Sequence, residues 1–354
     1  MKILIIISTL DFGGAQKQVV EDVNMLSQNN KVFLLSFEPG PLQMQVDKSI
    51  PVSILKRTRY LTTARKIASI IRINQISIVH AHLYAPMVIA AIAGRITGVP
   101  IIWNFHSHSY EKSFKARILH KFAASLSSVK AILFPATELK QYYEVEGYGF
   151  PRQKCRISYN SGQKIDQNPK RDIRNINEII KIGFIGRIIP LKRVHLLVEL
   201  ADFLLSKDYE KFKIAVVGDG PELETLMLAV KNRNLESFIT FHGFKEDTAF
   251  YYRQFDVFAF PSREEVLSLS LIDAGMNGLA SVAFDVGGNH EIISNAHTGF
   301  LVDSQEQFFE KIFELIQNDK LRKQLGDNAR EECFLKFSPS ARLEFLKKLY
   351  AELL

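Results

Sequence analysis

Two cations stand beside a glycine where a predicted strand gives way to a predicted helix. In the segment FIGRIIPLK, Gly186 and Arg187 follow the strand predicted over Ile179–Ile185. Lys192 falls in the first turn of the helix predicted over Leu191–Leu205. Cations at a helix start oppose the helix dipole, so a purely structural role is unfavourable. A bound diphosphate would stabilise both cations, which favours a diphosphate site over two solvated surface charges.

A second polar segment, PSREEVLSLSLIDAGMNG, follows the strand predicted over Val257–Phe260. Its helical periodicity runs over Leu267–Met276, with Glu265 just before the helix and Asp273 about two turns along it. Free backbone amides at such a helix start can hold a phosphate. Two acids eight residues apart are also a common surface pattern. The spacing alone therefore assigns neither carboxylate a role.

Glycines also mark other turns between strands and helices. Gly13 and Gly14 follow the strand predicted over Lys2–Ser8 and let the backbone approach a ligand beside a helix N-terminus. A tight turn without a ligand needs glycine equally. Gly218–Pro221 is predicted to be a structural turn that starts the next helix, because Pro lacks the N–H that a first helical residue leaves unpaired.

Four histidines occur near the ends of predicted strands. His80 and His82 lie in VHAHLY, and His106 and His108 lie in FHSHSY. An H-x-H pair on a strand projects both rings to one face, so a metal site is one interpretation. We expect no metal site, because the pairs fall where strand geometry is ending and the chain has no Asp-x-Asp. One histidine lining a ligand cleft is the expectation that remains.

Alternating strands and helices predict an α/β protein with two doubly wound parallel sheets. The other predicted strands are Lys31–Ser36, Ile78–Ala81, Ile101–Asn104, Ala131–Phe134, Lys213–Val217, Phe238–Phe241 and Ser281–Ala283. The other predicted helices are Gln16–Leu26, Thr62–Ile73, Phe114–Leu126, Glu222–Val230, Phe308–Gln317 and Ala341–Leu354.

A polar stretch, residues 161–178, separates two strand-first halves. We predict an N-terminal domain over 1–165, a linker over 166–178, a C-terminal domain over 179–340 and a last helix over 341–354. That helix could pack on either domain. Such folds bind ligands outside the carboxyl ends of their strands, which places the predicted site in a cleft between the domains.

Composition and charge narrow the class of protein. With 354 residues, 47% hydrophobic and 23% charged, the composition excludes disordered, collagen-like and disulfide-framework proteins. Residues 1–170 hold 22 basic and 10 acidic residues, and residues 171–354 hold 23 and 28. The basic residues Lys56, Arg57, Arg59, Arg65, Lys66 and Arg72 crowd one amphipathic stretch. It is predicted to lie on an anionic membrane, with a solvated helix face as the alternative, and no motif supports nucleic-acid binding.

Targeting signals are weak in this sequence. The apolar run Ile3–Ile7 is too short for a signal peptide and predicts a buried strand instead. No segment reaches the ~20 apolar residues of a membrane span. The two cysteines, Cys155 and Cys333, fit a reducing compartment. We therefore expect a cytoplasmic protein.

The ordered motifs resemble those of bacterial glycosyltransferase family 4, retaining enzymes of the GT-B fold. Nearly the whole chain takes part, in the family's order. The motifs are GGAQ from Gly13, FHSH ending at His108, FIGRIIPLK from Phe184, VVGDGPE from Val216, PSREEVLSLSLIDAGMNG from Pro261, VGGNHEII from Val286 and TGFLV from Thr298.

The resemblance implies that the C-terminal domain binds a nucleotide sugar and the N-terminal domain the acceptor. It assigns the diphosphate to Arg187 and Lys192, the donor sugar near its reacting carbon to Glu265 and the transferred sugar to His106. The implied donor-binding residues are Gly13, Gly14, Gly186, Val266, Leu267, Ser268 and Asp273. Asp273, which would bind the ribose, stands where the family has Glu, and Val266 stands where it has Gly. These departures leave the identity of the donor open.

The implied reaction moves a sugar from a UDP- or GDP-linked donor to a saccharide acceptor carried on undecaprenyl diphosphate. It would need neither metal nor cofactor, because preorganised cations and helix amides stabilise the departing diphosphate. The implied setting is lipopolysaccharide or capsule synthesis at the inner face of the cell membrane. Attack from the same face, with a phosphate oxygen taking the acceptor proton, leaves Glu265 no role as a nucleophile. An inactive sugar-nucleotide-binding partner is the alternative function, and a nucleotide-sugar epimerase fits the motif order poorly.

Overall fold

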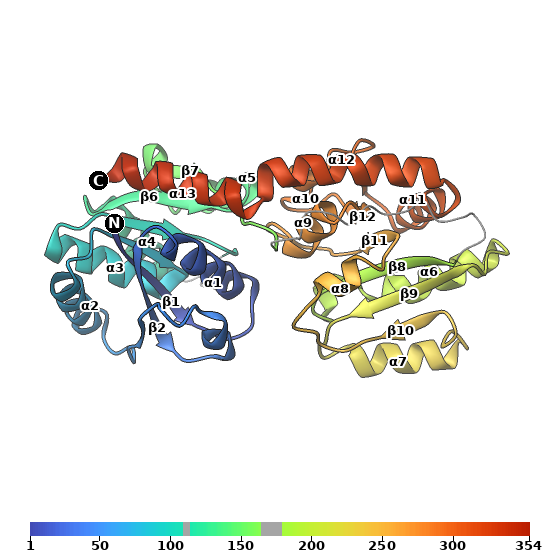
Figure 1. Cartoon of the computed structure of the whole chain (residues 1–354), viewed down its shortest axis with the longest axis horizontal. Coiled ribbons are helices and arrows are strands. Elements are labelled where there is room, and N and C mark those ends of the chain that lie inside the picture. Colours follow the sequence, from blue (N-terminus) through green and yellow to red (C-terminus); the bar gives the residue numbers. More distant parts are fainter. Residues whose placement is uncertain (109–113, 164–178) are drawn as a thin grey trace. The chain divides into compact units, whose positions relative to one another are not determined.

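The computed structural model describes residues 1–108, 114–163 and 179–354, which form two compact units. Unit 1 contains Met1–Asn160 and Pro339–Leu354, and unit 2 contains Ser161–Ser338. Figure 1 shows the elements of both units. The predicted linker over 166–178 lies outside the described residues.

Unit 1 is built on a seven-stranded sheet in the order β3-β2-β1-β4-β5-β6-β7, and every pairing is parallel. The strands are β1 (Lys2–Thr9), β2 (Lys31–Glu38), β3 (Val52–Ile54), β4 (Ile78–His82), β5 (Ile101–Asn104), β6 (Val129–Phe134) and β7 (Cys155–Ile157). The edge strands β3 and β7 were not predicted from the sequence. Each has three residues, too few to show an alternating pattern.

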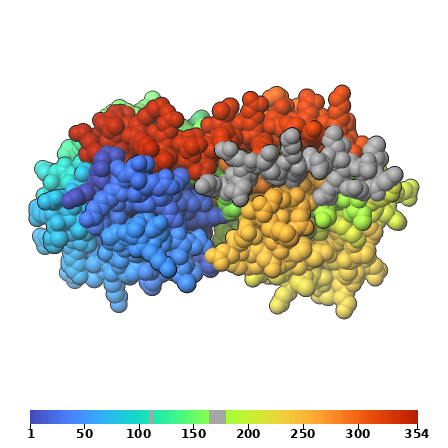
Figure 2. Space-filling view, viewed as in Figure 1, coloured from blue at the N-terminus to red at the C-terminus, as the bar shows by residue number. Residues whose placement is uncertain are grey.

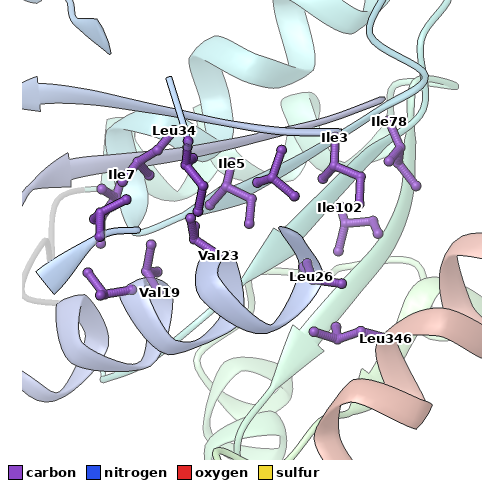
Figure 3. Close-up of a cluster of buried hydrophobic side chains, with 14 of the residues drawn as sticks. Ile3, Ile5, Ile7, Val19, Val23, Leu26, Leu34, Ile78, Ile102 and Leu346 are labelled. Carbon is purple, nitrogen blue, oxygen red and sulfur yellow. The ribbon is translucent and has the colours of Figure 1, made fainter. Parts of the chain in front are cut away.

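Helices pack on this sheet and bury its apolar side chains. They are α1 (Gly14–Ser27), α2 (Tyr60–Asn74), α3 (Tyr84–Thr97), α4 (Phe114–Ser125), α5 (Thr137–Val145) and α13 (Pro339–Leu353). Ile3, Ile5 and Ile7 of β1 lie in one buried cluster with Val23 of α1 and Leu346 of α13 (Figure 3). The N-terminal apolar run is therefore a buried interior strand of a parallel sheet, as predicted.

The last helix, α13, belongs to unit 1 although it is the most distant in sequence. In the space-filling view its residues (red) lie against N-terminal residues (blue), and α13 packs on α1 (Figure 2). Asp22 of α1 accepts hydrogen bonds from Arg342 Nε at 2.5 Å and Nη2 at 2.6 Å. Arg342 Nη1 also donates to the Tyr159 carbonyl at 2.6 Å. This buried bidentate ion pair fixes the end of the chain to the N-terminal domain.

Unit 2 is built on a six-stranded parallel sheet in the order β10-β9-β8-β11-β12-β13. Its strands are β8 (Ile180–Ile185), β9 (Phe212–Val217), β10 (Ile239–Phe241), β11 (Val257–Phe260), β12 (Ala280–Phe284) and β13 (Gly299–Val302). Its helices are α6 (His195–Ser206), α7 (Leu223–Asn232), α8 (Ala249–Tyr252), α9 (Leu269–Met276), α10 (Asn289–Ile292), α11 (Gln305–Gln317) and α12 (Asp319–Phe337).

The predicted helix starts in unit 2 were wrong by one to four residues. Residues Pro190–Lys192 form a separate 3-10 turn, and α6 begins only at His195, because Arg193 adopts a left-handed φ of 49°. Lys192 is therefore not in the first turn of that helix. α9 begins at Leu269, two residues after the predicted start, because Ser268 caps it. α7 begins at Leu223, one residue after the predicted start.

Candidate active site

Two loops of unit 2 leave neighbouring strands and are joined to each other. One follows β8 and contains Arg187 and Lys192; the other follows β11 and contains Glu265. Because β8 and β11 are adjacent parallel strands, both loops emerge at the same sheet edge. The Arg263 N–H donates to the Leu191 carbonyl at 2.8 Å, which ties the second loop to the first.

Lys192 and Glu265 form an ion pair between these loops. The Ser262 hydroxyl donates to Glu265 Oε1 at 2.7 Å, and Lys192 Nζ lies 5.2 Å from the centre of the Phe260 ring. The side chains of Lys192 and Glu265 are only 17% and 10% exposed, so both charges are largely removed from water. No local sequence pattern indicated this pair, since 73 residues separate its members.

Arg187 differs from Lys192 in its surroundings. Its side chain is exposed, and within residues 1–108, 114–163 and 179–354 it forms no ion pair. The backbone around it is fixed: the Gly186 N–H donates to Val217 at 3.0 Å, and the Ile188 N–H donates to Asp219 at 2.8 Å. An exposed guanidinium on a fixed backbone is available to a ligand anion.

A glycine turn packs closely against the backbone of the first loop. Gly218 has φ 142°, and a Cβ there would overlap the Gly186 carbonyl oxygen. A Cβ on Gly220 would overlap the Ile188 carbonyl oxygen in the same way. The predicted structural role of this segment therefore has a specific cause, which is close approach to the backbone on both sides of Arg187.

A second glycine turn supports the Glu265 loop. Gly287 has φ 53°, and a Cβ there would overlap the Glu265 carbonyl oxygen. The Gly288 N–H donates to the Val266 carbonyl at 2.9 Å. The backbone of the segment with valine at position 266 is thus held by the turn after β12, and the Glu265 side chain is directed to Lys192.

The N-terminus of α9 follows the Glu265 loop. Ser268, buried beside the buried Leu267, caps the helix by accepting from the Leu271 N–H at 3.3 Å. The N–H groups of Leu269 and Ser270 precede the first intrahelical bond and have no acceptor in the part of the chain that the structure describes. Unpaired first-turn amides and the helix dipole make this end electropositive.

Asp273 lies on α9 but is engaged within the protein. It is 5% exposed, and its Oδ1 accepts from the Gln163 N–H at 2.7 Å. Gly162 lets this segment approach, since a Cβ there would contact Oδ1 of Asp273. Asp273 thus holds residues 161–163 against α9, a contact that sequence analysis did not anticipate because those residues were assigned to a polar stretch.

In unit 1, three histidines form one group, in which His80 and His82 are buried and His106 is partly exposed. His80 and His82, both on β4, stack with ring centres 4.4 Å apart, and His82 Nδ1 lies 2.9 Å from His106 Nε2. β4 thus extends through His82, beyond the predicted end of the strand. Burial, reinforced by Arg342, lowers the pKa of His106 to about 3; burial lowers that of His80 to about 3 as well. His108 stands apart, 3.4 Å from a Glu138 carboxylate oxygen.

No three or more His, Cys, Asp or Glu side chains among the described residues are arranged to hold a metal ion. Gly13 and Gly14, the remaining predicted ligand residues, lie at the start of α1. Gly13 is extended, and its carbonyl accepts the Lys17 N–H at 2.9 Å. Among the predicted site residues, Lys192, Glu265, Leu267 and Ser268 lie together in unit 2.

Family models match both halves of the chain. One described as glycosyltransferase family 4 matches residues 12–161, and one described as glycosyl transferases group 1 matches residues 166–332. The chain belongs to glycosyltransferase family 4. Its two doubly wound sheets are the two Rossmann-like domains of the GT-B fold.

Two curated relatives of this glycosyltransferase align over nearly all of its length, and a third aligns over 46% of it. An Escherichia coli UDP-Gal:alpha-D-GlcNAc-diphosphoundecaprenol alpha-1,3-galactosyltransferase is 22% identical, with 96% of this chain and 94% of the relative covered. A Campylobacter jejuni alpha-1,4-N-acetyl-D-galactosaminyltransferase that acts on a diphospho-undecaprenol-linked saccharide is 26% identical, with 94% of each covered. A Staphylococcus aureus poly(ribitol-phosphate) alpha-N-acetylglucosaminyltransferase is 29% identical, but the chain spans only 34% of its length.

Solved structures resemble this glycosyltransferase over the full chain. HepE of Anabaena in complex with UDP has a TM-score of 0.83 at 18% identity, with 100% of both chains covered. A glycosyltransferase from Rickettsia africae has a TM-score of 0.84 at 21% identity, with 99% of this chain and 98% of that chain covered. These likenesses establish the fold.

Proposed function

We propose that this glycosyltransferase moves a sugar, with retention of configuration, from a nucleoside diphosphate sugar to a saccharide on undecaprenyl diphosphate. Two relatives covered along their length act on diphospho-undecaprenol-linked acceptors, and HepE has been solved with UDP and with UDP-glucose. These names support a nucleotide-linked donor and a lipid-linked acceptor. The donor we propose is UDP- or GDP-linked, and the proposed place is bacterial surface polysaccharide synthesis at the cytoplasmic face of the membrane.

The Lys192–Glu265 pair carries this proposal. Cleavage of the glycosyl–phosphate bond builds negative charge on the leaving diphosphate. A preorganised cation in a largely water-excluded position stabilises that charge better than a solvated one. Lys192 meets this description, and the exposed Arg187 and the amides at the α9 N-terminus add donors beside it. We propose that these groups act without a metal ion or other cofactor.

Glu265 acts as an orienting group in this scheme. It holds Lys192 in place and, with Ser262, presents a fixed carboxylate to the donor sugar. The carbon–oxygen bond to the phosphate breaks, the acceptor oxygen bonds to the same face of that carbon, and the acceptor proton passes to a phosphate oxygen. Val266, Leu267, Ser268 and Gly186 contribute backbone contacts to the donor. Asp273 also contacts the ribose, although its Oδ1 atom already accepts a hydrogen bond from the Gln163 N–H.

We assign the acceptor to unit 1, together with contacts to the donor from Gly13, Gly14 and His106. We place Gly13 and Gly14 beside the donor phosphates, because the N-terminus of α1 offers unpaired amides there. His106 faces the transferred sugar with one ring nitrogen, as the other nitrogen is occupied by His82.

We propose that the basic helix α2 binds the membrane that carries the lipid-linked acceptor. Arg59, Arg65, Lys66 and Arg72 are exposed on or beside α2, and no acidic residue occurs between Asp47 and Glu111. Leu61 and Ile73 are also exposed, by 49% and 77%. An amphipathic helix of this kind lies on anionic lipid. No helix of the described residues is long and apolar enough to span a bilayer, so we propose peripheral association.

Co-sedimentation with vesicles tests the membrane partner. The protein should bind phosphatidylcholine vesicles that contain phosphatidylglycerol at low salt, and not phosphatidylcholine alone. R65E/K66E should abolish binding, whereas K320E/K323E, which changes two exposed lysines of α12, should preserve it. Equal binding by both double variants would contradict the assignment to α2.

Release of nucleoside diphosphate tests the transfer reaction. UDP-, GDP- and dTDP-sugars are incubated with a saccharide on undecaprenyl diphosphate, with and without EDTA. We expect one donor to be consumed, equally in both conditions. K192A should lower kcat by about 10²–10³-fold, the effect of removing one preorganised stabilising group. R187A should also lower it.

K323A, at an exposed lysine of the same unit, is the matched control and should leave kcat unchanged. Unchanged turnover in K192A and R187A would overturn the proposed roles. Tight nucleotide binding by calorimetry, with no turnover of any donor, would show an inactive binding partner instead. Loss of activity in EDTA that a divalent cation restores would contradict the metal-independent scheme.

A further inference from the structure

A buried polar chain connects the last helix of the protein to His106. The Tyr350 hydroxyl of α13 lies 2.7 Å from His80 Nδ1. His80 stacks on His82, and His82 Nδ1 lies 2.9 Å from His106 Nε2. Tyr350, His80 and His82 are completely buried, and all four residues belong to unit 1.

These histidines are neutral near pH 7. Burial first, then the nearby Arg342 and other histidines, lowers the pKa of His82 well below its usual value, and burial likewise lowers the pKa of His80 and His106 to about 3. A neutral imidazole has one donor and one acceptor nitrogen, so its partners decide where the proton lies. The hydrogen bonds that each ring makes therefore set the tautomer of that ring.

The partners of His106 Nε2 favour its acceptor form. His82 Nδ1 can donate to it, and the Asn104 side-chain amide, 3.4 Å away, points its Nδ2 to the same atom. Asn104 Nδ2 also donates to the Phe105 carbonyl at 2.9 Å, which fixes the orientation of the amide. With Nε2 accepting, the proton of His106 lies on Nδ1.

The Nδ1 atom of His106 is buried and has no hydrogen-bond partner within the described chain. A buried N–H group without an acceptor is unfavourable, so such a group in a native protein needs an explanation. A ligand oxygen supplies one. The other nitrogen of the ring is already committed to His82, so Nδ1 is the atom that remains for a substrate.

We propose that Tyr350 is a positioning residue for glycosyl transfer, which holds His106 in its Nδ1–H tautomer through His80 and His82. The inference rests on the proposed function, in which His106 faces the transferred sugar. His80 and His82 meet face to face without a hydrogen bond, so the chain conducts no proton and acts by fixing ring orientation. The C-terminal helix thus completes a site of the N-terminal domain.

Anchoring of α13 is a separate task that does not need the Tyr350 hydroxyl. The buried Arg342–Asp22 pair and the apolar side chains Leu346 and Leu349 already fix the helix to unit 1. Tyr350→Phe therefore keeps the helix docked and the ring in its edge-on contact with His80, 6.0 Å between centres. It removes only the hydroxyl.

A double-mutant cycle measures the coupling. With the donor and acceptor that the wild-type enzyme uses in the release assay, Y350F should lower kcat roughly tenfold, the scale of one displaced hydrogen bond, with little change in the donor KM. In an H106A background, Y350F should have no further effect. Independent, multiplying effects of the two substitutions would overturn the proposal.

Nitrogen-15 NMR of the histidine rings in the full chain gives a readout that needs no turnover. Wild-type His106 should be the Nδ1–H tautomer, and Y350F should mix it with the other tautomer. The control is L346A, a buried apolar truncation on the same helix, which should lower the Tm without changing the tautomer or kcat.

An Nε2–H tautomer in the wild type, or an unchanged His106 spectrum in Y350F, would contradict the positioning role. If the wild-type protein turned over no donor at all, the proposed function would fail, while the tautomer measurement would still decide the structural claim.

Discussion

The two units share one architecture but place opposite kinds of chemistry at the carboxyl ends of their strands. In unit 2 the side chains are charged: Lys192 and Glu265 pair at a largely buried position, and Arg187 is exposed beside them. In unit 1 they are the neutral imidazoles His80, His82 and His106. Burial keeps the histidines uncharged, whereas pairing allows the charges of unit 2 to remain.

The two groups also differ in what holds them. In unit 2, glycine turns that follow the neighbouring strands β9 and β12 support the loops from behind. In unit 1, support comes from α13, a helix supplied by the far end of the chain. Net charge does not reveal this division. Residues 171–354 have an excess of acids, yet they contain Arg187 and Lys192, the cations proposed to bind the diphosphate. Local placement decides the chemistry of each unit.

The largest expected effect comes from removing the support of unit 1. In R342A, Asp22 would remain buried without its partner, which typically costs about 3–5 kcal/mol. Although burial favours the neutral guanidine, Asp22 raises the pKa of Arg342, so the pair is ionic in the folded state. Urea unfolding followed by fluorescence measures the loss, because the only tryptophan, Trp103, lies in β5 of unit 1.

The control on the same helix is the exposed ion pair between Lys348 and Glu344, whose side chains are 77% and 66% exposed. K348A should change the free energy of unfolding by no more than about 0.5 kcal/mol. Equal effects of R342A and K348A would show that α13 is not held by the buried pair.

Removing the support of unit 2 should have the next largest effect. G287A forces Ala into φ 53° and places its Cβ against the Glu265 carbonyl. G243A tests only the cost of a side chain in the left-handed backbone conformation, because Gly243 has φ 67° with open space around it. We expect a loss of about 1 kcal/mol in G243A and about 2–4 kcal/mol in G287A, measured by chemical unfolding.

Only G287A should also lower the rate of nucleotide release, because it displaces the loop that carries Glu265. If G243A lowered that rate equally, backbone strain in unit 2 would explain the loss and the specific support of Glu265 would be disproved.

Much of the fold was predictable because apolar strand runs and amphipathic helical periods determine it, although the longest helix, α12, was not predicted. β5 and β11 have the predicted bounds, and the interior strand β1 extends one residue beyond the prediction. The sequence failed where local signals are short or ambiguous. β3, β7 and β13 have three or four residues. α3 is apolar on nearly all sides, so it lacks the amphipathic period that identified α1 and α2.

The candidate site was predictable as residue types and not as contacts. Glycine before a cation indicated the loop of Arg187, and helical periodicity placed the start of α9 to within two residues. The Lys192–Glu265 pair, the bond from Gln163 to Asp273 and the contact of Tyr350 with His80 each join distant segments. Such pairings depend on the packing of whole sheets and leave no local pattern.

The smallest expected effect, acid sensitivity, sharpens the contrast between neutral and charged units. His120 in unit 1 has a pKa of about 3 because it is buried, against 6.5 in an unfolded chain. Between these values the unfolded state binds more protons, so stability is complete above about pH 6.5 and falls as the pH is lowered towards 3. Each such histidine contributes at most about 1.4 kcal/mol per pH unit.

H120F should flatten the pH dependence of urea unfolding by about one histidine, since both ring nitrogens lack partners among the described residues and aromatic rings surround it. Trp103, 5.6 Å away, reports the transition. H290Q, which replaces a half-exposed histidine of unit 2, is the control for histidine replacement. An unchanged slope in H120F would mean that His120 is protonated in the folded protein, and that unit 1 is not the neutral counterpart of unit 2.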